Sequence, residues 1–138
     1  MSDQITDPSE ESVIWLAQSQ QHLLDLLTAQ YGECHLDGSE KDLELCQRLI
    51  DDKRVKAKNI LEAQCIGVAL GNVWVKTTPM QWKQVKNEFG SMLALHNPGT
   101  KMVLYPLTMV SKRLAHHQEI DLISLYTQFA WSNKKPAQ

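Results

Sequence analysis

The stretch ILEAQCIGVALGNVWV, residues 60–75, decides how this fold is organised, because it is apolar on almost every side of the helix that it predicts. Its only strongly polar side chains are those of Glu62, Gln64 and Asn72. A helix that is apolar nearly all round is buried inside a fold. We therefore expect a central helix here, with the other elements packed around it.

Small residues recur at every fourth position of this helix, at Ala63, Gly67 and Gly71. Glycine inside a helix costs about 1 kcal/mol relative to alanine, so close packing must offset that loss. The strip predicts that another element's backbone lies directly against the helix. The two glycines do not form a dinucleotide-binding motif, because that motif requires a strand that turns into the helix.

Two amphipathic helices are predicted before the central one. Asp7 and Pro8 are the residue types of an N-cap and a first helical position, and apolar residues then recur at helical spacing up to Tyr31. A second helix begins at Ser39, and its apolar stripe continues to Ile50. Each helix has one face to bury.

After the central helix the apolar period changes from 3.6 to 2, which predicts strands. The expected strands span residues 82–86, 91–95 and 101–105. The segment NPGT, residues 97–100, places proline and glycine at the two central positions of a type II turn. Connections this short predict an antiparallel meander.

Pro106 ends the third strand, because proline has no N–H to donate to a neighbouring strand. Thr108 is then the expected N-cap of a short helix over residues 109–116, and Asp121 that of a last helix. The sequence thus predicts an α+β fold with helices 1–3, then a three-stranded antiparallel meander, then two C-terminal helices. The buried third helix is expected to back the sheet.

The length and composition of the chain are those of a globular protein. The chain has 138 residues, of which 43% are hydrophobic and 22% charged, as in a single globular domain. We expect one domain over residues 1–138, with residues 1–7 and 132–138 frayed. The first residues are acidic and polar, unlike a targeting signal, and the longest apolar stretch is shorter than the about 20 residues that cross a membrane. A cytoplasmic location without membrane contact is expected.

Several short motifs follow the central helix in a fixed order. They are EFG (88–90), LAL (93–95), Pro98, YP (105–106), TMVSKR (108–113), DL (121–122) and LY (125–126). Their order resembles an uncharacterised bacterial family, domain of unknown function 3806, over roughly residues 60–127. The resemblance implies a bacterial, soluble α+β protein and no particular activity. Lys86 and Asn87 stand where the family carries acidic residues.

Catalytic and metal-binding constellations are not evident in the sequence. His116 and His117 cannot share one ion, since neighbours on a helix point about 100° apart. Cys34 and His35 are likewise adjacent, in a loop, and a metal site would need three or four convergent ligands. Ser111 and His116 lie five residues apart, about 140° around a helix, so they do not form a nucleophile and base. We expect no catalytic residues, no metal and no cofactor.

Charge is distributed unevenly along the chain. Residues 1–52 hold 12 of the 16 acidic residues and two basic ones, whereas residues 53–138 hold the other 12 basic residues and four acidic ones. The acidic part either faces a partner or packs against the basic part. The overall charge of −2 argues against nucleic acid as the partner.

The first candidate site is the corner after the third strand. Its candidate residues for binding an anion, a ligand or a partner are Thr108, Ser111, Lys112 and Arg113. A helix N-terminus with a hydroxyl and nearby basic side chains can bind an anion. The alternative is structural, namely a strand end, a helix cap and an amphipathic helix.

The second candidate site is an acidic surface on the second helix, formed by Glu40, Asp42 and Glu44. Such a surface can steer a basic protein partner. The leading hypothesis is therefore a non-catalytic protein-interaction module, for example an immunity-like protein or a secretion accessory. The alternative is a domain that binds a small ligand or anion at the helix N-terminus after the third strand, and an enzyme ranks third.

Overall fold

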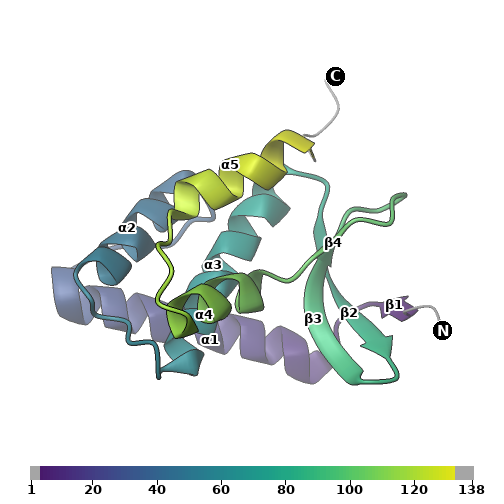
Figure 1. Cartoon of the computed structure of the whole chain (residues 1–138), viewed down its shortest axis with the longest axis horizontal. Coiled ribbons are helices and arrows are strands. Elements are labelled where there is room, and N and C mark those ends of the chain that lie inside the picture. Colours follow the sequence, from purple (N-terminus) through teal and green to yellow (C-terminus); the bar gives the residue numbers. More distant parts are fainter. Residues whose placement is uncertain (1–3, 133–138) are drawn as a thin grey trace.

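The structure is a computed structural model that describes residues 4–132. Its elements in chain order are β1 (Gln4–Thr6), α1 (Glu10–Tyr31), α2 (Glu40–Asp51), α3 (Ile60–Thr77), β2 (Gln81–Asn87), β3 (Gly90–His96), β4 (Val103–Leu104), α4 (Pro106–Ala115) and α5 (Leu122–Ser132). The predicted α+β class is confirmed, although the sheet has four antiparallel strands and not three. The helices lie to one side of the sheet (Figure 1).

Helix α3 lies at the centre of the fold, as its apolar sequence predicts. A Cβ atom added to Gly67 would lie 2.5 Å from the carbonyl oxygen of Pro106 and 2.7 Å from the Cα atom of Leu107. One added to Gly71 would overlap the indole ring of Trp82. The predicted close approach of another backbone is confirmed at Gly67, where it is that of the first turn of α4, whereas at Gly71 the neighbours are side chains.

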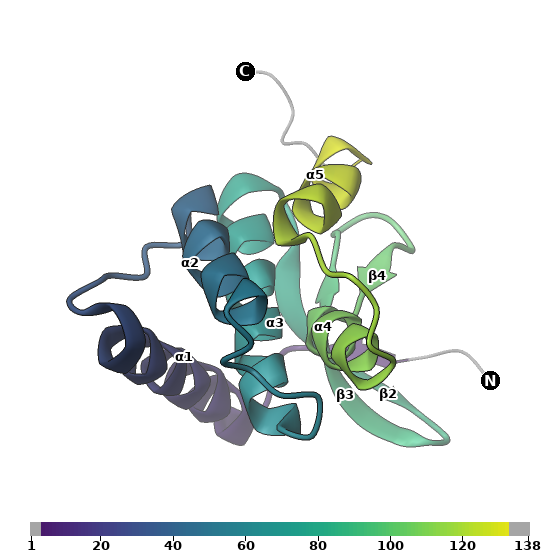
Figure 2. The same cartoon turned by 60° about the vertical axis from the view of Figure 1, so that its left-hand side comes forward.

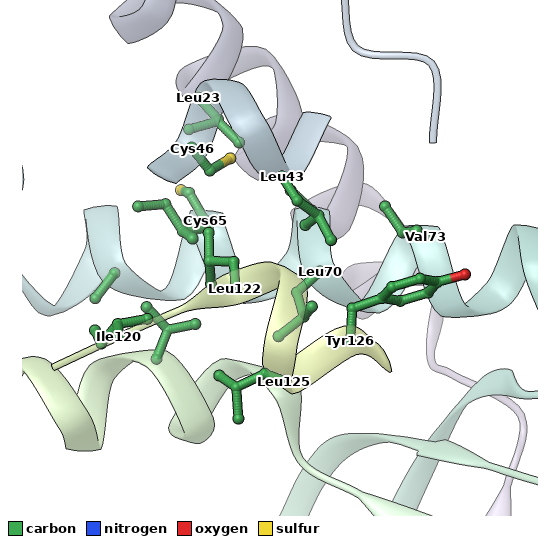
Figure 3. Close-up of a cluster of buried hydrophobic side chains, with 14 of the residues drawn as sticks. Leu23, Leu43, Cys46, Cys65, Leu70, Val73, Ile120, Leu122, Leu125 and Tyr126 are labelled. Atoms are coloured by element: carbon green, nitrogen blue, oxygen red, sulfur yellow. The ribbon is translucent and has the colours of Figure 1, made fainter. Parts of the chain in front are cut away.

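The other face of α3 packs on helices α1, α2 and α5. Their buried side chains form one cluster (Figure 3), which includes Leu23 of α1, Leu43 of α2 and Leu122 of α5. Gln47 joins α2 to α5 because its side-chain amide donates to the carbonyl oxygen of Ile120 at 2.9 Å and accepts from the N–H of Leu122 at 2.9 Å. This cluster makes the helical half of the molecule one packed unit.

The sheet has the order β1-β2-β3-β4. Strands β2 and β3 pair along their whole length, from Gln81 opposite His96 to Asn87 opposite Gly90. The type II turn after β3 is confirmed, because Gly99 has φ 81 and the N–H of Thr100 bonds to the carbonyl oxygen of Asn97 at 3.1 Å. The meander is therefore built as its turn residues predict.

The N-terminal segment differs from the prediction in two ways. Residues Gln4–Thr6, expected to be frayed, form strand β1 on the outer edge of β2. The N-cap of α1 is Ser9 and not Asp7, since the Ser9 hydroxyl accepts from the N–H of Ser12 at 3.1 Å. The Asp7 carboxylate instead pairs with Lys83 of β2 at 2.6 Å, which lowers the pKa of Asp7. The segment is held to the sheet and not to its own helix.

The corner after β4 also differs from the prediction. The third predicted strand is limited to Val103 and Leu104, and α4 begins directly at Pro106, with Tyr105 at the N-cap position. Thr108 is therefore not the N-cap; its hydroxyl lies inside the first turn and donates to the carbonyl oxygen of Tyr105 at 3.0 Å. Proline suits the first helical position because its missing N–H would have no partner there.

The predicted caps of α2 and α5 agree with the structure, whereas α3 extends two residues beyond its predicted end, to Thr77. Ser39 caps α2, and Asp121 accepts from the N–H of Ser124 at the start of α5. None of the helices within residues 4–132 is both long enough and apolar enough to span a membrane.

Candidate binding groove

An open groove of about 370 Å³ lies where α1, α3, the sheet and the start of α4 meet. Its lining residues come from all four parts of the fold: Ser12, Trp15, Gln64, Gln84, Ser91, Met92, Leu93, Tyr105, Leu107 and Thr108. Figure 2 shows α4 in front of the strands whose side chains line this groove. The groove thus occupies the corner that the sequence singles out.

None of the lining side chains carries a charge. Two are aromatic, Trp15 and Tyr105, and both are half-buried. The Ser12 hydroxyl donates to the side-chain oxygen of Gln84 at 2.9 Å, which joins α1 to β2 across one end of the groove. A groove of this kind suits a ligand with apolar groups and neutral hydrogen-bonding groups.

Apolar side chains also remain exposed on the elements that form the groove. Met92, which lines it, is 49% exposed, and Leu61, one turn before Gln64 on α3, is also 49% exposed. Val13, next to Ser12 on α1, is 53% exposed. Of these three residues, Met92 adds exposed apolar surface to the groove itself.

The outer edge of β3 borders the groove. Strand β4 pairs only with Leu95 and His96, so residues 90–94 of β3 have no neighbouring strand on that side within the described sheet. The register would place position 106 opposite Leu93 if β4 continued. Residue 106, however, is Pro106, which is the first residue of α4 and not part of a strand. Its backbone lies against Gly67 of α3. The chain therefore turns away from β3 and leaves its edge open.

The structure separates the four residues predicted at this corner. Thr108 lines the groove, but Ser111, Lys112 and Arg113 do not. Lys112 and Arg113 belong to the last turn of α4, and the Arg113 guanidinium donates to the carbonyl oxygen of Met109 at 2.9 Å. The two basic side chains are thus not gathered around the N-terminus of α4, and anion binding by all four residues stays a prediction.

The predicted acidic surface on α2 is smaller than expected. Glu40 and Glu44 are exposed, but the Asp42 side chain is buried, and its carboxylate accepts from the N–H groups of Asp37 at 3.1 Å and Gly38 at 2.8 Å. Burial raises the pKa of Asp42. Asp42 therefore holds the loop before α2 and is not part of a surface that faces a partner. No residue of α2 lines the groove.

The two buried thiols are poor candidates for chemistry. Cys46 and Cys65 are buried side by side between α2 and α3 (Figure 3), and burial raises the pKa of Cys46 and raises that of Cys65 to about 11. A thiol acts as a nucleophile or metal ligand only as its thiolate. Within residues 4–132, no group of three His, Cys, Asp or Glu residues could hold a metal ion.

Comparison with known proteins identifies the family. A family model described as a domain of unknown function, DUF3806, matches residues 42–126, more than half of the chain. The chain belongs to the DUF3806 family. The matched region of DUF3806 begins earlier than the resemblance seen in the sequence and includes most of α2. No curated protein matches the chain.

One solved structure is similar to this DUF3806 protein. It is a crystal structure from Bacteroides thetaiotaomicron VPI-5482 with a TM-score of 0.83 and 15% sequence identity, and the match covers 94% of this chain and 47% of the other. At this identity the likeness shows a shared fold. The chain spans about half the length of that protein.

The DUF3806 match does not include the whole groove. Gln64, Gln84 and Thr108 lie inside the matched residues, whereas Ser12 and Trp15 of α1 lie outside them. The groove residues on α1, α3 and β2 were missed from the sequence, because they lie far apart in the chain and form no motif. Among the groove residues, only Thr108 was predicted from the sequence as part of a candidate site.

Proposed function

We propose that this DUF3806 protein is a non-catalytic interaction module that binds a segment of another protein in the groove between α1, β3 and α4. The observation that carries the proposal is the position of the groove. It is uncharged, contains two half-buried aromatic side chains, and lies directly beside the open edge of β3. A polypeptide offers both the apolar side chains and the backbone groups that such a surface can bind.

The same features favour a polypeptide over an anion. An anion site needs basic side chains or several free N–H groups directed at one point. The side chains that line this groove are hydroxyl, amide, aromatic and aliphatic ones, and Lys112 and Arg113 lie elsewhere on α4. The sulfate experiment described below separates the two hypotheses.

Catalysis ranks below binding for a chemical reason. Among the groove residues, the candidate nucleophiles are Ser12, Ser91 and Thr108, and no lining residue is a histidine or a carboxylate that could act as their base. The Thr108 hydroxyl donates to a backbone carbonyl in its own helix turn. A hydroxyl needs an adjacent base to become a nucleophile.

An immunity-like protein or a secretion accessory would each use such a binding surface, and both roles remain within this proposal. A basic partner would in addition contact Glu40 and Glu44, which are exposed on α2. Since α2 contributes no groove residue, we expect these two acidic side chains to affect the rate of association more than the affinity for the bound segment.

The experiment is a selection of peptides from a random library displayed on phage, with the full chain as bait. The dissociation constant of the best synthetic peptide is then measured by fluorescence. We expect Gln64→Arg, which places a charge in the groove, to weaken binding by about tenfold or more. The matched control is Gln18→Arg on the exposed face of α1, which should bind like wild type.

Two results would contradict the proposal. One is a selection that enriches no peptide above an unrelated bait protein. The other is a selected peptide that binds wild type and Gln64→Arg equally, because the bound segment would then lie outside the groove.

A further inference from the structure

The open edge of β3 also indicates how the bound segment would lie, an inference that rests on the proposed function. In an antiparallel pair, the backbone groups of successive residues point alternately toward one neighbour and toward the other. The N–H of Asn97 donates to the carbonyl oxygen of Met102 at 3.2 Å, on the β4 side of the sheet. Because the direction alternates, every second residue before Asn97 points the same way. The backbone N–H and C=O groups of Leu95, Leu93 and Ser91 therefore also point to the β4 side.

Strand β4 uses only part of this row. Leu104 stands opposite Leu95, and the chain then leaves the sheet at Pro106. Ser91 and Leu93 therefore direct their N–H and C=O groups toward a position that no described strand occupies. Met92 and Ala94 direct theirs toward β2, where they face Val85 and Lys83.

Several devices commonly protect such an edge from pairing with another chain, including charged side chains, proline or a covering element. The unpaired part of β3 reads Gly-Ser-Met-Leu-Ala over residues 90–94 and contains none of these residue types. The groove shows that α4 does not cover it, because Ser91, Met92 and Leu93 all line open space. The edge is thus available to an extended backbone.

We propose that the partner segment binds as an added β-strand, antiparallel to β3 and in line with β4, with its backbone bonded to Ser91 and Leu93. The side chains of Ser91, Leu93 and Gln84 share one face of the sheet, since Gln84 stands opposite Leu93. Every second side chain of the added strand therefore enters the groove. These should be apolar or neutral polar, as the uncharged lining requires.

The first test is amide hydrogen exchange by NMR on the full chain, with and without the selected peptide. The amides of Ser91 and Leu93 should exchange rapidly in the free protein and become protected when the peptide binds. The amides of Met92 and Ala94, which face β2, should be protected in both states. Binding in the groove without new protection at Ser91 and Leu93 would overturn the added strand and leave the interaction module in place.

The second test removes single backbone N–H donors from the selected peptide by N-methylation. Methylation of alternate peptide nitrogens should weaken binding by about tenfold or more each, and methylation of the intervening nitrogens should have little effect. An equal loss at every position, as for a bound helix, contradicts the proposal.

On the protein side, Ser91→Pro removes an N–H that points away from β2, so folding should persist while peptide binding is lost. Ser91→Ala keeps that N–H and should lose less affinity than Ser91→Pro, and Gln18→Arg should lose none. Circular dichroism checks that Ser91→Pro is folded. Equal peptide binding by Ser91→Pro and Ser91→Ala would overturn the proposal. So would protection of the Ser91 and Leu93 amides that appears without peptide as the protein concentration is raised, because a second copy of the chain would then occupy the edge.

Discussion

Pro106 separates two regions of the molecule that differ in how completely they are packed. On one side its backbone lies against Gly67 of α3, where no space remains for a methyl group. On the other side the edge of β3 has no neighbouring strand over residues 90–94 within the described part of the chain. The first region fixes the fold, and the second leaves backbone groups free to bind.

The comparison shows that the open region depends on the closed one. The strand β4 ends where α4 begins, and α4 begins where it does because the glycines of α3 allow its first turn to lie against them. A larger residue at position 67 would force the backbone of Pro106 and Leu107 to shift. Tight packing at one place can therefore hold a binding edge open at another.

The largest expected effect comes from filling the closed region. Gly67→Ala should lower the free energy of unfolding by about 3 kcal/mol, because its Cβ would overlap backbone atoms that cannot move aside. Gly71→Ala should cost less, because its added Cβ meets the Trp82 side chain and not backbone atoms. Urea denaturation of both variants measures the difference. A Gly67→Ala protein as stable as wild type would contradict the close contact.

The next effect tests the direction of the backbone groups along β3. Met92→Pro removes an N–H that faces β2 and should cost about 2 kcal/mol more than Ser91→Pro, whose lost N–H faces the open edge. Thermal unfolding of the two variants measures this. If Ser91→Pro proves the more destabilising of the two, the assigned alternation is reversed.

A smaller effect concerns Asp42, a second tightly packed contact. Burial raises its pKa above the ordinary value of 3.8, so the folded carboxyl keeps its proton at pH values where the unfolded one has lost it. Its contribution to stability is therefore present below pH 3.8 and is lost as the pH rises through the folded pKa.

Asp42→Asn removes this titration. The stability of the Asn variant relative to wild type should therefore increase as the pH rises above 3.8, as measured by urea denaturation at several pH values. If the difference in free energy of unfolding between Asp42→Asn and wild type stays constant with pH, or changes in favour of wild type as the pH rises, the pKa of Asp42 is not raised.

The smallest effect is expected from anions at the corner after β4. Sulfate should raise the melting temperature of wild type and of Lys112→Ala/Arg113→Ala equally, since excluded salts stabilise proteins in general. A larger rise in wild type would instead support an anion site at Thr108, Ser111, Lys112 and Arg113. Differential scanning fluorimetry in matched salt makes this comparison.

The sequence predicted the closed region well because its signals are local. A helix that is apolar on all sides, with glycines at every fourth position, has few ways to pack, and Gly67 and Gly71 lie at close contacts as expected. The type II turn and the caps at Ser39 and Asp121 also depend on residues a few positions apart.

The open region was not predictable in the same way. Strand β1 is only three residues long and depends on pairing with β2, about 80 residues later in the chain. Trp15 and Gln64 reach the groove from two helices, and neither position has a residue pattern that indicates binding. Thr108 has the residue type of a cap, but Pro106 already begins the helix two residues earlier.

The contact between Gly67 and Pro106 also limits how this chain can evolve. A side chain gained at position 67 would meet the backbone of the neighbouring helix, so that change alone would be selected against as a folding defect. Position 67 could accept a larger residue only after the chain around Pro106 had moved. Gly67 therefore has almost no permitted substitution on its own, although the neighbouring groove residues Gln64 and Leu107 are not limited by this contact in the same way.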